Sequence, residues 1–101
     1  MASLENKIDE TTAIALADLF RTLGDSTRII ILAALSNKEF TVGELAKVAD
    51  ISESATSHHL RHLRQMRIVK HRKEGRFVIY SLDDEHIEQL IRFGFEHVGH
   101  E

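Results

Sequence analysis

Residues 41–66, TVGELAKVADISESATSHHLRHLRQM, decide the fold of this chain. Thr41 and Glu44 have the spacing of a capping box, which predicts that a short helix begins there. A break at Asp50 and Ile51 follows, and a second helix then runs to about Met66. A short capped helix, a brief turn and a second helix are the pattern of a helix-turn-helix motif.

The second helix, which begins at Ser52 or Glu53, has one apolar and one polar face. Its apolar positions mark a buried stripe and are Ala55, Leu60, Leu63 and Met66. A helix that reads the major groove needs short side chains near its N-terminus that donate or accept hydrogen bonds. The residues that we expect to contact base edges are Ser54, Thr56, Ser57, His58 and His59. Glu53 suits this surface only if it accepts from a cytosine amino group, and it otherwise stabilises the helix N-terminus.

Two further helices are expected before this motif. Apolar residues recur at helical spacing over about residues 8–23, and Gly24 ends that helix. Asp25 or Ser26 is suited to cap the next helix, which we expect over about residues 27–36.

A hairpin and a last helix are expected after the motif. Residues 68–72 and 77–81 are β-branched and aromatic runs, and the turn between them contains Gly75, which favours a β-hairpin. The last helix starts near Leu82 or Asp83. The expected fold is therefore mainly α with a β-hairpin wing, a winged helix-turn-helix of order α-α-α-α-β-β-α.

Charge is segregated along the chain, although the formal net charge is only −3. Residues 61–76 carry seven cations and one anion, the cations being Arg61, Arg64, Arg67, Lys70, Arg72, Lys73 and Arg76. Residues 83–101 carry six anions and one cation. A local basic patch of this kind suits a polyanion despite the acidic total. We expect phosphates of double-stranded operator DNA to be contacted by Arg61, Arg64, Lys73 and Arg76. The alternative is a solvated polar helix beside an exposed hairpin.

Length and composition narrow the class of protein. A chain of 101 residues with 43% hydrophobic and 29% charged residues is typical of one globular domain, which we expect to span residues 1–101. The sequence has no cysteine, which excludes disulfides, thiolate metal sites and cysteine nucleophiles. It shows neither a membrane-spanning stretch nor a secretory signal at residues 1–10, so a cytoplasmic location without membrane contact is expected.

Four potential zinc ligands lie in the last nineteen residues, in the motifs Asp84-x-His86 and His97-x-x-His100. One carboxylate and three imidazoles could complete a tetrahedral site. His86 and His97 share a helix face, but eleven residues of helix rise about 16 Å, which one ion cannot bridge. Two antiparallel copies can bring the start of one helix to the end of the other. The motif therefore predicts a homodimer with two equivalent inter-subunit sites.

The same residues also have an explanation without metal. Acidic residues favour the first turn of a helix for capping and dipole reasons. Histidines near a chain end are often simply solvated. His62 and His71 remain unassigned, because a surface or groove-side position suits them better than a ligand role.

Short motifs along most of the chain resemble the ArsR/SmtB family of metal-responsive winged-helix repressors. They are Leu23-Gly24-Asp25-Ser26-Thr27-Arg28, Val42-Gly43-Glu44-Leu45-Ala46, Ser54-Ala55-Thr56-Ser57-His58-His59-Leu60, Glu74-Gly75-Arg76 and Tyr80-Ser81-Leu82. Within that family, Asp84, His86, His97 and His100 resemble the C-terminal-helix site of the CzrA/SmtB-type zinc and cobalt sensors. The resemblance implies a homodimer paired through its first and last helices and a repressor that releases DNA on binding metal.

The sequence thus favours a repressor regulated by Zn²⁺, with Co²⁺ or Ni²⁺ as other candidates, and with no small-molecule substrate. A winged-helix regulator without metal sensing is the first alternative. A small zinc hydrolase is the second, but four candidate ligands leave no open position on the metal, and the chain has no phosphate-binding loop or nucleophile motif. An enzyme is therefore not expected.

Overall fold

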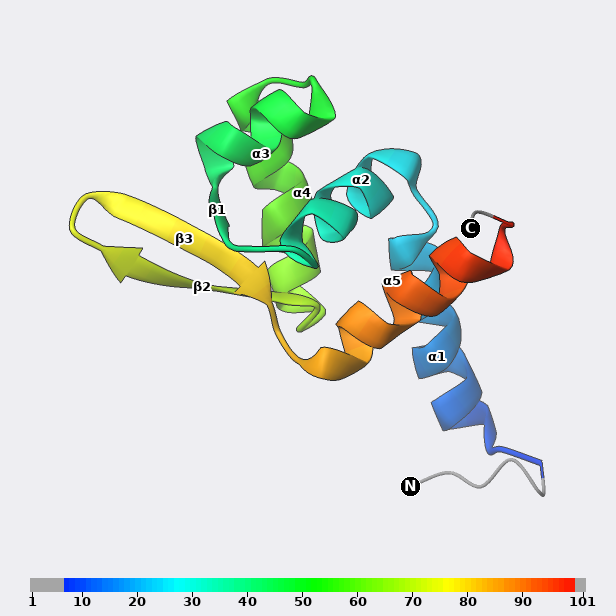
Figure 1. Cartoon of the computed structure of the whole chain (residues 1–101). Coiled ribbons are helices and arrows are strands. Elements are labelled where there is room, and N and C mark those ends of the chain that lie inside the picture. The colour runs from blue at the N-terminus through cyan, green and yellow to red at the C-terminus, as the bar shows by residue number, and fades with distance from the viewer. Residues whose placement is uncertain (1–6, 100–101) are drawn as a thin grey trace.

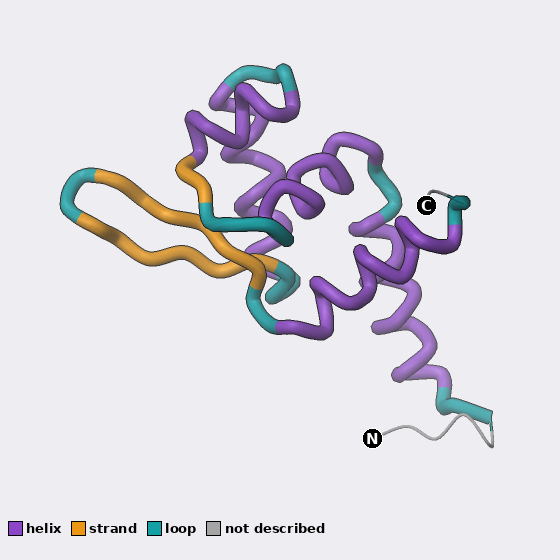
Figure 2. The backbone as a smooth tube through the Cα atoms, in the orientation of Figure 1, coloured by secondary structure: helices purple, strands orange, loops and turns teal. Residues whose placement is uncertain are grey.

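The computed structural model describes residues 7–99, in which five helices and one small sheet follow the expected order (Figures 1 and 2). In chain order the elements are α1 (Glu10–Leu23), α2 (Ser26–Leu35), β1 (Phe40–Thr41), α3 (Val42–Ala49), α4 (Glu53–Gln65), β2 (Val69–Glu74), β3 (Phe77–Leu82) and α5 (Glu85–His97). No helix among these residues is long and apolar enough to cross a membrane. The arrangement is a winged helix-turn-helix, which confirms the expected fold.

Side-chain caps start the two helices of the motif where the sequence places them. The Thr41 hydroxyl accepts from the Glu44 backbone N–H at 3.2 Å, and the Glu44 carboxylate accepts from the Thr41 N–H at 2.9 Å. The Ser52 hydroxyl accepts from the Ala55 N–H at 3.0 Å. Each bond satisfies a backbone donor that the first helical turn leaves without a partner, so the capping prediction is confirmed.

Helix α4 ends in a left-handed turn, after which the chain enters the wing. Arg67 has φ 60°, its N–H donates to Arg64 O at 3.0 Å, and the Ile68 N–H donates to Leu63 O at 2.9 Å. These two bonds form a Schellman motif, in which glycine is the usual residue at the left-handed position. The turn fixes the direction in which β2 leaves α4.

The core lies between α2, α3 and α4, closed by the start of β2 and of α5. Its most deeply buried apolar side chains are Ile31, Leu32, Leu45, Leu60, Leu63, Ile68 and Val69. Thr56 is also fully buried, and its hydroxyl donates to Ser52 O at 2.8 Å. The expectation that Thr56 contacts DNA is therefore wrong: with Leu60 and Leu63 it lies on the inward face of α4.

The sheet has strand order β1-β3-β2 and is antiparallel throughout. Strand β1 was not expected from the sequence; its two residues pair with β3, Phe40 opposite Tyr80. Strands β2 and β3 form the wing, with Glu74 opposite Phe77 and Gly75 at φ 63° in the turn. Figure 1 shows this hairpin extending away from the helices, so its outer half is reachable by a large partner.

Helix α1 and the C-terminal part of α5 both lie at the end of the molecule opposite the wing (Figure 1). Helix α5 begins a few residues later than expected, because Asp84 is its N-cap. Apart from Thr22 and Leu23 in α1 and Ile87 in α5, the described residues of the two helices are not fully buried. Their exposed large apolar side chains are Ile14, Leu16, Phe20, Phe93 and Phe95. An apolar surface of this extent is typical of an interaction face.

Candidate nucleic-acid interface and metal-binding residues

The outward face of α4 carries short polar and basic side chains in helical register. Ser54, His58 and Arg61 are exposed, and their spacing of four and three residues places them on one side of the helix. Ser57 lies beside them and is half-buried. The hydroxyls and imidazole can donate to or accept from base edges, and the guanidinium can reach a base or a phosphate.

Glu53, the one anion at the start of this face, is turned toward α3. A Cβ atom added at Gly43 would lie 3.2 Å from Glu53 Oε2. The carboxylate thus lies directly beside Gly43 in the first turn of α3, where a larger residue would require the carboxylate to shift. At that position it is favoured by the positive end of the α3 dipole.

The basic side chains differ in whether a nearby carboxylate offsets their charge. Arg61 and Arg64 on α4, and Lys73 and Arg76 on the wing, are exposed. Arg72 instead forms a two-pronged ion pair with Glu39, at 2.7 and 2.9 Å, and also bonds to Glu74. These carboxylates raise the pKa of Arg72 above its usual range, and the Arg72 guanidinium lowers the pKa of Glu39.

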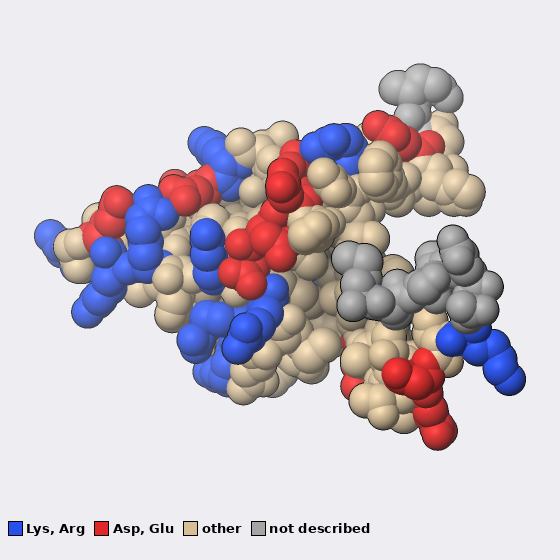
Figure 3. Space-filling view, turned by 90° about the horizontal axis from the view of Figure 1, so that it is seen from below, with Lys and Arg blue, Asp and Glu red and all other residues tan. Residues whose placement is uncertain are grey.

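Figure 3 shows the resulting pattern on one face of the molecule. Lys and Arg side chains gather over the wing at the left end, and a second basic group lies at the centre beside acidic side chains. The charge is divided into patches, as the sequence predicted. An anionic duplex would therefore be attracted to the wing and α4 rather than to the whole surface.

Arg28, near the start of α2, contacts two histidines of α4. Its Nε donates to His59 Nδ1 at 2.9 Å and its Nη2 to His62 Nδ1 at 2.9 Å. Burial, followed by the Arg28 cation, lowers the pKa of His59. A contact of His59 with DNA would therefore have to use Nε2. No local signal in the sequence links Arg28 to these histidines, because they lie 31 and 34 positions away.

The residues expected to bind metal are distributed along α5. Asp84 Oδ1 accepts from the N–H groups of His86 and Ile87, at 3.0 and 3.2 Å. Asp84 Oδ2 lies 3.6 Å from His86 Nδ1, and both side chains are more than half exposed. His97 is the last residue of α5, and His100 lies outside the described residues.

Among the described residues, only Asp84 and His86, two of the four expected ligands, are therefore close enough to bind the same ion. Two donors bound to one tetrahedral ion at about 2.0–2.1 Å are roughly 3.3 Å apart, close to the Asp84–His86 separation. Residues 7–99 hold no group of three or more potential ligands. The carboxylate and imidazole thus suit a chelating pair that needs further ligands from elsewhere.

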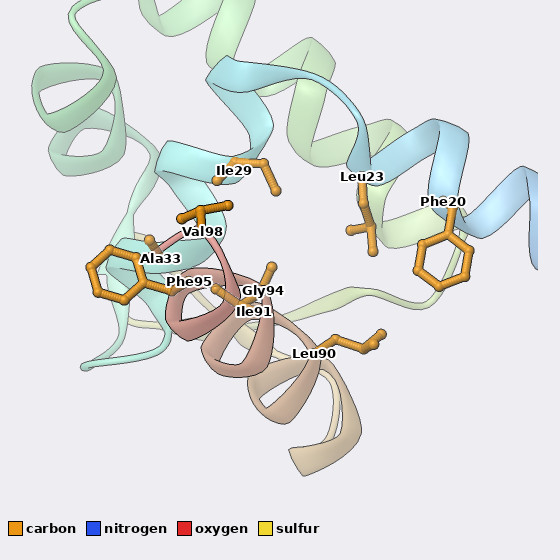
Figure 4. Close-up of a pocket in the computed structure, with 9 residues that line it drawn as sticks. All are labelled: Phe20, Leu23, Ile29, Ala33, Leu90, Ile91, Gly94, Phe95 and Val98. Atoms are coloured by element: carbon orange, nitrogen blue, oxygen red, sulfur yellow. The ribbon is translucent and has the colours of Figure 1, made fainter. Parts of the chain in front are cut away.

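An apolar groove separates α1 from α5. It encloses about 400 Å³ and is lined by Phe20 and Leu23 of α1, by Ile29 and Ala33 of α2, and by Leu90, Ile91, Gly94, Phe95 and Val98 in and after α5. Figure 4 shows these side chains around a shared space between the three helices. A groove of this composition fits an apolar segment better than a polar ligand.

Comparison with known proteins agrees with this architecture. Residues 25–71 match the family model described as "Bacterial regulatory protein, arsR family". The chain is 45% identical over 82 residues to a cadmium resistance transcriptional regulatory protein CadC homolog of Staphylococcus aureus, covering 80% of this chain and 68% of the relative. It is 43% identical over 83 residues to a transcriptional repressor SmtB homolog of Synechocystis, covering 82% and 63%. The matched segment thus spans about two thirds of these relatives.

Solved structures give the same result for the fold. Reduced HlyU from Vibrio cholerae superposes with a TM-score of 0.81 at 30% identity, covering 90% of this chain and 96% of that one. The relatives named here are transcriptional regulators and not enzymes.

Proposed function

Because the chain belongs to the arsR family of bacterial regulatory proteins, we propose that it binds operator DNA as a homodimer and releases it when zinc binds at the C-terminal helices. The family assignment makes the chain a helix-turn-helix regulator of transcription. The observation that carries the finer proposal is the Asp84–His86 pair at one end of α5, 3.6 Å apart, with His97 at the other end.

The DNA contacts divide into two roles. Ser54, Ser57 and His58 on the outward face of α4 read base edges, and His59 can add a contact through Nε2. The phosphate contacts are made by Arg61 and Arg64 on α4 and by Lys73 and Arg76 on the wing. This division predicts that the first group sets sequence preference and the second sets overall affinity.

A homodimer would supply a second copy of the chain. Two DNA half-sites and a complete metal site each require that second copy. The apolar groove between α1 and α5, together with the exposed large apolar side chains of these helices, is the surface that we assign to the partner subunit. A twofold axis there would place two α4 helices in successive major grooves of an inverted repeat. The single domain that we expect over residues 1–101 would then be the protomer.

The metal would be held by Asp84 and His86 of one subunit and by His97 and His100 of the other. One carboxylate and three imidazoles suit four-coordinate Zn²⁺, and Co²⁺ accepts the same set. The ion would supply a crosslink between two α5 helices. Exposed Asp84 and His86 side chains are consistent with ligands that become buried only in the dimer.

A backbone path joins the metal-binding residues to α4. The N–H of Asp83, next to Asp84, donates to Ile68 O at 3.0 Å, and the Ile68 N–H donates to Leu63 O in the last turns of α4. A displacement of the start of α5 would therefore be transmitted to the end of α4 through these two hydrogen bonds. A ligand shifts such an equilibrium only through its different affinity for the two states, and the coupling is reciprocal.

The test uses a duplex selected from a random DNA pool by the protein itself. Its affinity is measured by fluorescence anisotropy with and without Zn²⁺. We expect zinc to weaken binding about 10²–10³-fold, a coupling of a few kcal/mol. His97→Ala should keep metal-free DNA binding and lose the zinc response. If wild-type affinity ignored zinc, the metal proposal would fail while DNA binding stood.

A regulator without metal sensing is the second candidate. The similarity to HlyU, described as a transcriptional activator of Vibrio cholerae, favours it at 36% identity over 73 residues. Titration with Zn²⁺, Co²⁺ and Ni²⁺ separates the two functions, because the second candidate predicts no binding of two ions per dimer. Enrichment of no duplex in the selection would contradict both.

A further inference from the structure

One guanidinium connects three helices at the edge of the DNA-reading face. Arg28 donates to His59 Nδ1 and His62 Nδ1, both at 2.9 Å, and to Thr22 O at 3.4 Å. Thr22 lies in the last turn of α1, Arg28 in the first turn of α2, and the two histidines one helical turn apart on α4. The planar fork of an arginine can serve three acceptors at once, which a lysine ammonium cannot match in geometry.

This link acts where α4 has little other polar attachment to these helices. Backbone packing of α4 is mainly against α3 and β2. The inward side chains of α4 are apolar apart from Thr56, and apolar packing is non-directional. Hydrogen bonds from a charged donor are stronger and more directional, so they can select one rotation and tilt of a helix.

We propose that Arg28 is a positioning residue for DNA recognition, which holds α4 in its reading orientation against α1 and α2 only while His59 and His62 are neutral. This rests on the proposed function, because it concerns the face of α4 that reads DNA. Arg28 itself need not contact a base. It acts through His59 and His62, which lie beside His58 and Arg61 on the same helix.

Protonation would break the link for a chemical reason. A guanidinium has no acceptor, so each Nδ1 must accept and each proton must reside on Nε2. A protonated imidazole donates from both nitrogens and repels the Arg28 cation. The ionisable groups near His59 are Arg28 and Asp25 from the α2 side and His58 and His62 on α4.

The direction of the pH effect follows from His59. Burial and then Arg28 lower the pKa of His59 below the ordinary 6.5 of an imidazole, and Asp25 opposes them. The neutral form is therefore favoured by folding at neutral pH. Stability that rests on this form is present above pH 6.5 and is lost as the pH falls from there through the lower pKa of the folded state.

The experiment measures discrimination, the ratio of affinities for a duplex selected by the protein and for random duplex, between pH 8 and pH 5.5. Metal-free full-length protein is used at constant ionic strength. Arg28→Met is compared with Lys38→Met, which removes one cation in the loop that follows α2. Double replacement of His59 and His62 by Asn keeps an acceptor near each Nδ1 position but removes the titration.

We expect wild-type discrimination to decrease at pH values lower than the ordinary imidazole pKa of 6.5, because the pKa of His59 is lowered in the folded protein. Arg28→Met should lower it about tenfold at pH 8, the equivalent of one hydrogen bond to a charged group, and Lys38→Met should not. The Asn pair should reduce the pH dependence relative to wild type, and Arg28→Met on that background should still lower discrimination. A pH-independent wild-type ratio, or equal ratios for Arg28→Met and wild type, would overturn the proposal.

Nitrogen NMR of the imidazoles tests the link without DNA. We expect both His59 and His62 to be protonated on Nε2 at pH 8, and Arg28→Met to release that preference. An Nδ1-protonated ring at either position contradicts the proposal. If selection enriches no duplex, the DNA function fails, and the imidazole spectra still decide whether Arg28 holds α4.

Discussion

Asp84 is the observed cap of α5 and a proposed metal ligand, and substitution can separate these two roles. Its Oδ1 accepts two backbone N–H groups at the start of α5, whereas Oδ2 faces His86 Nδ1. Asp84→Asn keeps a side-chain oxygen for the cap, because Asn and Asp cap helices about equally well. It removes the anionic ligand. Asp84→Ala removes both.

The expected magnitudes differ between the metal-free and zinc-bound proteins. Without metal, Asp84→Ala should cost about 1 kcal/mol of stability, or about 4–8 °C in Tm, and Asp84→Asn only a few tenths. With free zinc at a thousand times the wild-type Kd, binding stabilises by about 4.1 kcal/mol per site. A 100-fold weaker site would retain about 1.4 kcal/mol.

Thermal melts with and without zinc, and competition with a chromophoric chelator, give these values. Gln89→Ala, an exposed position on α5 with no proposed role, is the control and should follow wild type in both states. An Asn variant stabilised by zinc as strongly as wild type would refute the ligand role of Asp84. Equal metal-free melting of the Ala and Asn variants would refute the capping role.

Three further predictions concern the reading helix and the wing. Arg76→Ala should weaken binding to every duplex and lower the salt slope by about one, whereas Arg72→Ala, whose charge Glu39 and Glu74 offset, should change the slope less; equal slopes for both would contradict this reasoning. Ser57→Ala should lower discrimination between selected and random duplex while Thr56→Val leaves it unchanged, and the reverse order would mean that the face of α4 is misassigned. Arg67→Gly should stabilise the protein by about 1 kcal/mol in chemical denaturation, because glycine adopts positive φ without the penalty of a Cβ; a loss of stability would argue against the left-handed turn.

The helix boundaries were predictable because their causes are local. A capping box at Thr41 and a Ser52 cap need only residues three positions away, and the wing turn needs only Gly75. Strand β1 has a different cause. Its two residues form a strand because Tyr80, forty positions later, lies opposite Phe40, and no local pattern signals such a pairing.

The error at Thr56 shows what sequence chemistry alone misses. Thr56 and Ser57 look equivalent as hydrogen-bonding residues, but only one faces the core. The spacing of Thr56, Leu60 and Leu63 at four and three residues did contain the signal, since these positions share a helix face. Residue type suggested a DNA contact, and helical phase excludes it.

For the candidate metal site, in contrast, the spacing in the sequence already indicated how the residues are arranged along the helix. The spacing of His86 and His97 already required a second helix, because a straight helix holds them about 16 Å apart. The structure of one chain agrees, since Asp84 and His86 are near each other and His97 ends the helix. How two chains would meet cannot be derived from a single α5, because the surface that we assign to the partner subunit also includes α1 and the apolar groove.

Besides its packing against α3 and β2, α4 has polar links at two places, and both start outside the reading face. Near its C-terminal end, the Leu63–Ile68–Asp83 backbone bonds connect it to α5. On its side, Arg28 connects His59 and His62 to the end of α1. Because α1 and α5 also carry the exposed apolar surface, a change in how two subunits pair would reach the DNA-reading residues through short, directional contacts. The face that we propose to read DNA is thus linked by hydrogen bonds to α1 and to the start of α5, the helices that we assign to dimerisation and metal binding. A regulated repressor requires links of this kind.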